Sequence, residues 1–188
     1  EPSSIQCPLG TDNSSCLTEK QVSAVEKIWS GVKTSDGDLI YPGLVPGGEA
    51  DPGGWGRWVT GAEPFTSLHW LGGEGFFRWF VFNDPDWDFT SFDFDEDLEY
   101  ALQKVGNSVD SNNPDLRRLR DNGSKLIVYH GWSDPDISPV ASINYYESVR
   151  SPSISMTVSF VDIDQMVSVE GITGGEMIDL EVIIPDFG

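Results

Sequence analysis

Basic residues are scarce in this chain of 188 residues, which has 11 lysines and arginines and 2 histidines against 31 acidic residues, a net charge of −20. A chain this acidic repels nucleic acid and anionic membrane surfaces, so we expect neither as a partner. Long apolar runs of membrane-spanning length are absent, as are a signal peptide and an initial Met. That start fits either a mature N-terminus or a missing one. Hydrophobic residues make up 38% of the chain, enough for a packed core, which argues against disorder.

Cysteine is nearly absent too, with only Cys7 and Cys16. The residues alone leave two alternatives, either free buried thiols or a short disulfide loop that implies an oxidising compartment. Two N-x-S sequons begin at Asn13 and Asn122, each in a turn-rich stretch, and both are glycosylation candidates. Together these features favour a secreted, extracellular protein.

The first half of the chain combines one clear helix with long irregular stretches. Thr18 and Gln21 form a capping box that predicts a helix over residues 19–30. Residues 31–75 are rich in Gly and Pro, so regular structure is not expected there, and a loop of this length is typically functional or packs as a cap. Residues 68–82 are dense in aromatics and predict a buried helix or strand.

The region that follows residue 50 is rich in tryptophan and aspartate. Five of the seven tryptophans fall between positions 55 and 87, and they either build a core or line an aromatic ligand pocket. Alternating aspartates resemble a calcium loop: Asp84, Asp86 and Asp88. Phe89 stands where such a loop needs Gly, so we prefer a structural role. Asp93 is predicted to cap a helix near 94–105, with Glu96 completing the box.

A helix–strand–loop–helix unit follows, of the kind that builds α/β sheets. Residues 114–120 predict a short helix, 125–129 a buried parallel strand, and 139–150 a helix that follows Ser138. In open α/β sheets, active groups lie beyond the carboxyl ends of strands. Asp134 occupies that position, and it is either a turn residue or the acid of a catalytic triad.

The stretch GSKLIVYHGWSDPDISPVASINYYESV resembles, nearly position by position, the pattern GGKLIxYHGWxDxxIxPxxSxxYYxxV of the tannase/feruloyl esterase family. The segment CPLGTDNSSCLTEKQVSAVEKIWSG is similar to the family's CLTxxQ helix, and IYPGLVPGGE and the acidic DPDWDFTSFDFD run also match. The resemblance implies a partial α/β-hydrolase fold with a loop-rich lid domain. Residues 1–105 would form part of the lid and 106–150 the C-terminal part of the hydrolase core.

The resemblance assigns roles to individual residues. Asp134 matches the triad aspartate, and Asp136 is the competing candidate. His130 is too close in sequence to serve Asp134 as the base and is interpreted as a structural hydrogen-bonding residue, as is His69. The resemblance also pairs Cys7 with Cys16, which match the family's short lid disulfide.

Other parts of the family pattern are missing. No G-x-S-x-G nucleophile motif occurs, and after residue 150 the P-G-M-x-H-C motif that supplies the base His is absent. Residues 151–188 are an atypical tail, which suggests a fragment or an aberrant end such as a frame change, although Ile178, Leu180, Val182 and Ile184 alternate as in a strand. The family's structural calcium would bind an Asp-rich loop upstream of residue 1, so no metal ligand is expected in this chain.

The resemblance implies a carboxylic ester hydrolase that cleaves feruloyl or galloyl esters, as small phenolic esters or as esters of plant cell-wall polysaccharide, through a Ser-Asp-His triad. Only the Asp lies in this chain, so the chain alone is expected to be inactive. The alternative is a non-catalytic, acidic, secreted module that binds aromatic glycans through its tryptophans.

Overall fold

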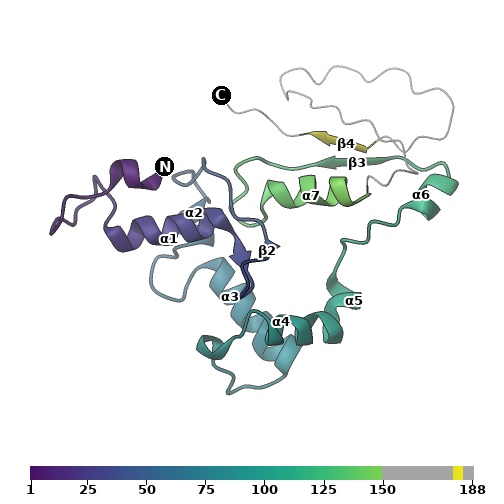
Figure 1. Cartoon of the computed structure of the whole chain (residues 1–188), viewed down its shortest axis with the longest axis horizontal. Helices are drawn as coiled ribbons and strands as arrows, with labels where there is room; N and C mark the ends of the chain where they lie inside the picture. Colours follow the sequence, from purple (N-terminus) through teal and green to yellow (C-terminus); the bar gives the residue numbers. More distant parts are fainter. Residues whose placement is uncertain (150–179, 184–188) are drawn as a thin grey trace.

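The structure, a computed structural model, describes residues 1–149 and 180–183, and Figure 1 shows an extended segment between α5 and α6 at which we divide it into two lobes. The N-terminal lobe covers residues 1–109 and the C-terminal lobe residues 117–149 and 180–183. The helices and helical turns of the N-terminal lobe are η1 (Pro2–Ile5), α1 (Glu19–Ser30), α2 (Trp55–Trp58), α3 (Leu68–Gly75), η2 (Phe76–Phe82), η3 (Phe89–Ser91), α4 (Glu96–Ala101), η4 (Leu102–Gly106) and α5 (Asn107–Val109).

Helix α1 begins where the capping box predicts. The hydroxyl of Thr18 accepts a hydrogen bond from the backbone N–H of Gln21, and the Gln21 side chain accepts one from the N–H of Thr18 at 2.8 Å. Cys7 and Cys16 form a disulfide, and the N–H of Cys7 donates to the carbonyl of Leu17 at 2.7 Å. The disulfide loop is therefore fastened directly to the start of the helix.

The stretch over residues 31–75 contains more regular structure than its composition predicts. Strands β1 (Val32–Lys33) and β2 (Leu39–Tyr41) pair antiparallel, and α2 and most of α3 also fall in this range. The prediction of an irregular loop was wrong there. The turn between the strands is closed by local bonds, with the N–H of Thr34 donating to Asp38 at 2.9 Å and Gly37 at a φ of 91°. A prediction from Gly and Pro content does not detect such a short hairpin, because it depends on a few local hydrogen bonds.

Helix α3 continues into the π-helical η2, so residues 68–82 are helical as one of the two alternatives predicted. The expectation that this segment is buried was wrong for most of it. Val81 is fully buried, whereas Trp79 and Phe80 are 57% and 54% exposed. Val81 packs with Ala101 and Val105 of α4 and η4, and Phe76, Phe77 and Phe82 lie around this core. A single helix pair covers only one face of η2, which leaves the other aromatics exposed.

Asp93 was predicted to cap a helix near 94–105, but α4 begins at Glu96 with Asp95 at the N-cap position, so Asp93 lies two residues before the cap. Its Oδ1 accepts hydrogen bonds from the N–H groups of Asp95 and Glu96 at 2.8 and 2.9 Å, and these donors lower the pKa of Asp93. The return bond to the N–H of Asp93 comes from Asp97 at 2.9 Å rather than from Glu96. The reciprocal bond predicted for Glu96 is therefore made by Asp97.

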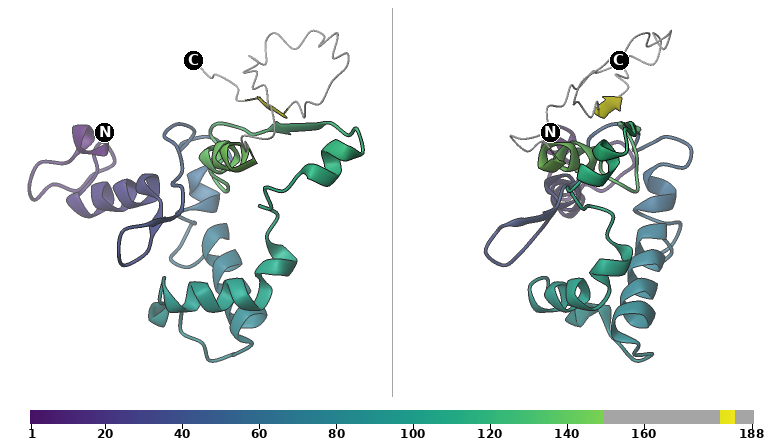
Figure 2. Two further views of the ribbon diagram at one scale, coloured as in Figure 1. Left: turned by 45° about the vertical axis from the view of Figure 1, so that its right-hand side comes forward. Right: turned by 90° about the vertical axis from the view of Figure 1, so that its right-hand side faces the viewer.

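The C-terminal lobe has the predicted helix–strand–loop–helix order. It comprises α6 (Arg117–Asp121), β3 (Leu126–Tyr129), α7 (Pro139–Val149) and β4 (Leu180–Ile183). Strands β3 and β4 pair in parallel, with Leu126 opposite Leu180, and α7 lies along them (Figures 1 and 2). Part of the alternating stretch in the tail thus forms the predicted strand, and the rest of the tail lies outside the described residues.

Candidate active site

The acid loop, residues 130–138, leaves the carboxyl end of β3 and returns into α7. Its turn is closed by the N–H of Asp134, which donates to the carbonyl of Gly131 at 3.2 Å. The Asp134 Oδ1 atom accepts hydrogen bonds from the N–H groups of Asp136 and Ile137, at 2.9 and 3.1 Å. These backbone donors fix the direction of the carboxylate, as a catalytic acid requires.

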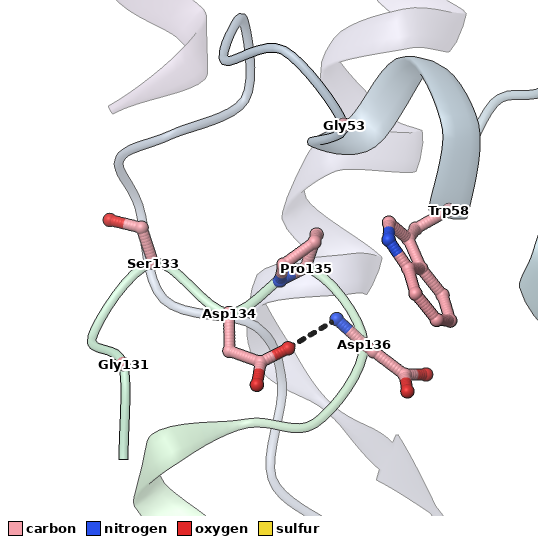
Figure 3. Close-up of a pocket in the computed structure, with 7 residues that line it drawn as sticks. All are labelled: Gly53, Trp58, Gly131, Ser133, Asp134, Pro135 and Asp136. Carbon is pink, nitrogen blue, oxygen red and sulfur yellow. Dashed lines mark hydrogen bonds between the residues drawn. The ribbon is translucent and has the colours of Figure 1, made fainter.

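Asp134 lines an open pocket of about 480 Å³ between the acid loop and the N-terminal lobe. In Figure 3 the carboxylate of Asp136 lies near the indole of Trp58, and Asp134 lies on the other side of Asp136, with its carboxylate turned to the Asp136 N–H. The lining residues are Gly53, Trp58, Gly131, Ser133, Asp134, Pro135 and Asp136. Trp58 borders this pocket, whereas Trp55 is buried at 9% exposure, and the role of the tryptophans in an aromatic ligand pocket stays a prediction.

His130 is held by hydrogen bonds on both ring nitrogens. Its Nε2 lies 2.9 Å from the carbonyl oxygen of Ile137, and its Nδ1 lies 2.6 Å from the hydroxyl of Ser142. A carbonyl only accepts, so Nε2 carries the hydrogen and donates it. Although Nε2 is also 3.4 Å from Oδ2 of Asp134, neither nitrogen is open to take a proton from a nucleophile. This agrees with the structural role predicted for His130.

Two segments of the N-terminal lobe contact the acid loop, one through a hydrogen bond and one through close packing. The buried hydroxyl of Ser138 donates to the carbonyl of Gly43 at 2.7 Å. Gly48 passes so close to Ser133 that a Cβ at position 48 would lie 2.7 Å from the Cβ of Ser133. The pKa of Tyr41, on β2, is raised, chiefly by burial and also by the negative charges of Asp136 and Asp134 in the acid loop.

A further contact joins the lobes through two side chains that sequence reasoning did not connect. His69 Nε2, on α3, lies 3.2 Å from Oδ1 of Asp136 in the acid loop. The two residues are separated by 67 positions, so no local pattern could have paired them. His69 was predicted to be structural and Asp136 to serve the loop, and the contact gives each a specific partner.

The acidic stretch behaves as predicted for a structural segment. Asp84 and Asp88 each use Oδ1 to accept a backbone N–H two residues on, at 2.9 Å from Asp86 and from Thr90. Within residues 1–149 and 180–183, no three His, Cys, Asp or Glu side chains are grouped closely enough to hold a metal ion.

The asparagine that begins each N-x-S sequon lies at the surface. Asn13 and Asn122 are both exposed, and the Oδ1 of Asn13 accepts hydrogen bonds from the N–H and hydroxyl of Ser15. Among the described helices, none has the length and apolar character needed to cross a membrane.

The chain resembles known fungal esterases in sequence. It is 37% identical over 143 residues to "Probable feruloyl esterase B" of Emericella nidulans, covering 74% of this chain and 25% of that protein. It is 32% identical over 145 residues to "Feruloyl esterase B" of Aspergillus niger, covering 77% and 26%. The chain thus spans about a quarter of the length of the curated relatives it matches.

The chain also resembles solved structures of fungal esterases. The crystal structure of feruloyl esterase B from Aspergillus oryzae superposes with a TM-score of 0.65 at 27% identity, covering 79% of this chain and 28% of that one. Tannin acyl hydrolase from Aspergillus niger gives a TM-score of 0.55 at 26% identity, covering 72% and 25%. The family model described as "Tannase and feruloyl esterase" matches residues 1–169. The chain belongs to the tannase and feruloyl esterase family.

Proposed function

We propose that this chain is part of a serine carboxylic ester hydrolase and that Asp134 is the acid of its Ser-Asp-His triad. The nucleophilic serine and the base histidine would come from sequence outside residues 1–188. In this mechanism the serine attacks the ester carbonyl, the histidine takes the serine proton, and water then hydrolyses the acyl-enzyme. Asp134 would hold the imidazole in the correct tautomer and stabilise the imidazolium.

The observation that carries this proposal is the setting of Asp134. Its carboxylate follows a parallel strand, is oriented by two backbone N–H groups, and borders a pocket. A triad acid needs a fixed direction and access to an imidazole, and both are supported here. Asp136 lines the same pocket, but its Oδ1 is engaged by His69.

The names of the relatives support phenolic esters as substrates, as feruloyl or galloyl esters of small molecules or cell-wall polysaccharide. We extend the proposal to an α/β-hydrolase core capped by a lid that includes the N-terminal lobe. Secretion, glycosylation at Asn13 and Asn122, and a structural calcium bound by residues outside this chain complete it. The disulfide between Cys7 and Cys16 favours an oxidising compartment.

The test uses the full-length enzyme, meaning this chain together with the flanking sequence that carries the nucleophile and base. Asp134→Asn should lower kcat for methyl ferulate by about 10⁴-fold, because the amide favours the wrong imidazole tautomer. Asp86→Asn, in an exposed loop away from the pocket, is the matched control and should keep normal turnover. Normal turnover of Asp134→Asn would remove Asp134 from the triad.

The non-catalytic alternative is favoured by one observation, the exposure of aromatic side chains on η2. Trp79 and Phe80 are more than half exposed and could stack on sugar or phenolic rings. Under this alternative, binding to feruloylated arabinoxylan would survive Asp134→Asn and be lost in Trp79→Ala. Hydrolysis by the full-length enzyme that requires Asp134 would decide for the esterase.

A further inference from the structure

The contact between His69 and Asp136 differs in kind from the other contacts on the acid loop. Gly43 reaches the loop through its backbone carbonyl, and Gly48 through close packing. His69 instead reaches it with a side chain from the first turn of α3, at 3.2 Å from Oδ1 of Asp136. A carboxylate only accepts, so His69 Nε2 carries the hydrogen that is shared.

Asp136 also contacts the catalytic acid directly. Its backbone N–H is the closer of the two donors to Oδ1 of Asp134, at 2.9 Å, while the N–H of Ile137 is at 3.1 Å. Pro135 stands between the two aspartates and fixes one backbone angle. A shift of Asp136 would therefore move the N–H that sets the direction of the Asp134 carboxylate.

Stability alone does not account for the pair. The side chains of His69 and Asp136 are 37% and 39% exposed, and ion pairs at such positions contribute little to the free energy of folding. His69 also lies beside Trp58, with ring centroids 6.0 Å apart, and Trp58 lines the pocket. The pair thus stands at the border of the site, with one member bonded to the acid.

We propose that His69 and Asp136 form a positioning pair that ties α3 to the acid loop and sets the direction of the Asp134 carboxylate. The inference rests on the proposed role of Asp134. Neither member touches the reacting atoms, so both act through Asp134. Because the acid matters most when the imidazolium forms, loss of the pair should lower kcat and leave KM nearly unchanged.

The experiment compares matched variants of the full-length enzyme with methyl ferulate as substrate. His69→Phe keeps a ring beside Trp58 but removes the donor, and kcat should fall by about 10- to 100-fold, as a small misplacement of a catalytic group does. His69→Gln retains an N–H that can reach Asp136 and should restore most of kcat. Asp136→Ala should match His69→Phe, and the double variant should lose no more than either single variant.

Several outcomes would overturn the inference. If His69→Phe keeps wild-type kcat while Asp134→Asn is inactive, the pair does not position the acid, although the proposed function stands. Additive losses in the double variant, or a His69→Gln variant as poor as His69→Phe, would also refute it. If kcat falls only in proportion to the fraction of enzyme that is folded, as measured by circular dichroism, the pair is a structural contact and does not position the acid. Activity retained in Asp134→Asn would instead defeat the proposed function itself.

Discussion

At the scale of single residues, Gly43 shows why the acid loop lies where it does. An added Cβ at this position would lie 2.2 Å from the carbonyl oxygen of Trp29 and 2.4 Å from that of Ile28. The next residue, Leu44, donates its N–H to the same Ile28 carbonyl at 3.2 Å, and the Gly43 carbonyl accepts the hydroxyl of Ser138. Gly43 is therefore the point at which α1 and the acid loop are joined through backbone atoms.

We expect Gly43→Ala to destabilise the chain by about 1–3 kcal/mol, the usual cost of forcing atoms into a packed contact. The melting temperature should fall, because backbone carbonyls cannot rotate away as a flexible side chain can. Gly56→Ala is the matched control, since a Cβ there meets nothing within 4 Å and position 56 lies in α2. Thermal unfolding followed by circular dichroism measures both, and equal melting temperatures for the two variants would contradict the packing argument.

At the scale of elements, the reciprocal capping bonds of α1 are local and can be tested alone. Thr18→Ala removes the hydroxyl that accepts the N–H of Gln21, and should cost about 1 kcal/mol. For a chain of this size that corresponds to a fall in Tm of about 2–4 °C. Ser23→Ala, at an exposed position inside the same helix, is the control and should leave Tm unchanged or slightly raised. A Thr18→Ala variant as stable as the control would show that the disulfide and tertiary packing, rather than the cap, hold the start of α1.

The elements that the sequence predicted are those determined by short-range patterns. The capping box marked the start of α1, and the apolar run bounded by turns marked β3. The burial of 68–82 was mispredicted because aromatic density reports apolar surface but not which neighbour covers it. The link from His69 to Asp136 was missed for a related reason, since a pair 67 positions apart depends on how α3 packs against the acid loop.

At the scale of the whole molecule, the described lobes leave large apolar side chains uncovered. Ile127 and Tyr129 point from β3 with 63% and 79% of their surface exposed, although both faces of a parallel sheet are normally buried. The chain spans about a quarter of the length of its relatives. We infer that polypeptide outside residues 1–188 covers this face in the full-length enzyme.

If this face is covered in the full-length enzyme, a lysine at position 129 and a lysine at position 128 should affect stability differently in the 188-residue chain. Tyr129→Lys should change the stability of the 188-residue chain by no more than about 0.5 kcal/mol, as is usual for an exposed site. Val128→Lys, on the half-buried opposite face, should cost more than about 1 kcal/mol. In the full-length enzyme Tyr129→Lys should become as damaging as Val128→Lys, because a lysine charge would be buried without a partner. Denaturant unfolding of both variants in both contexts measures the difference. If Tyr129→Lys stays neutral in the full-length enzyme, that face of β3 is open to solvent there too, and the strand lies at the surface of the fold.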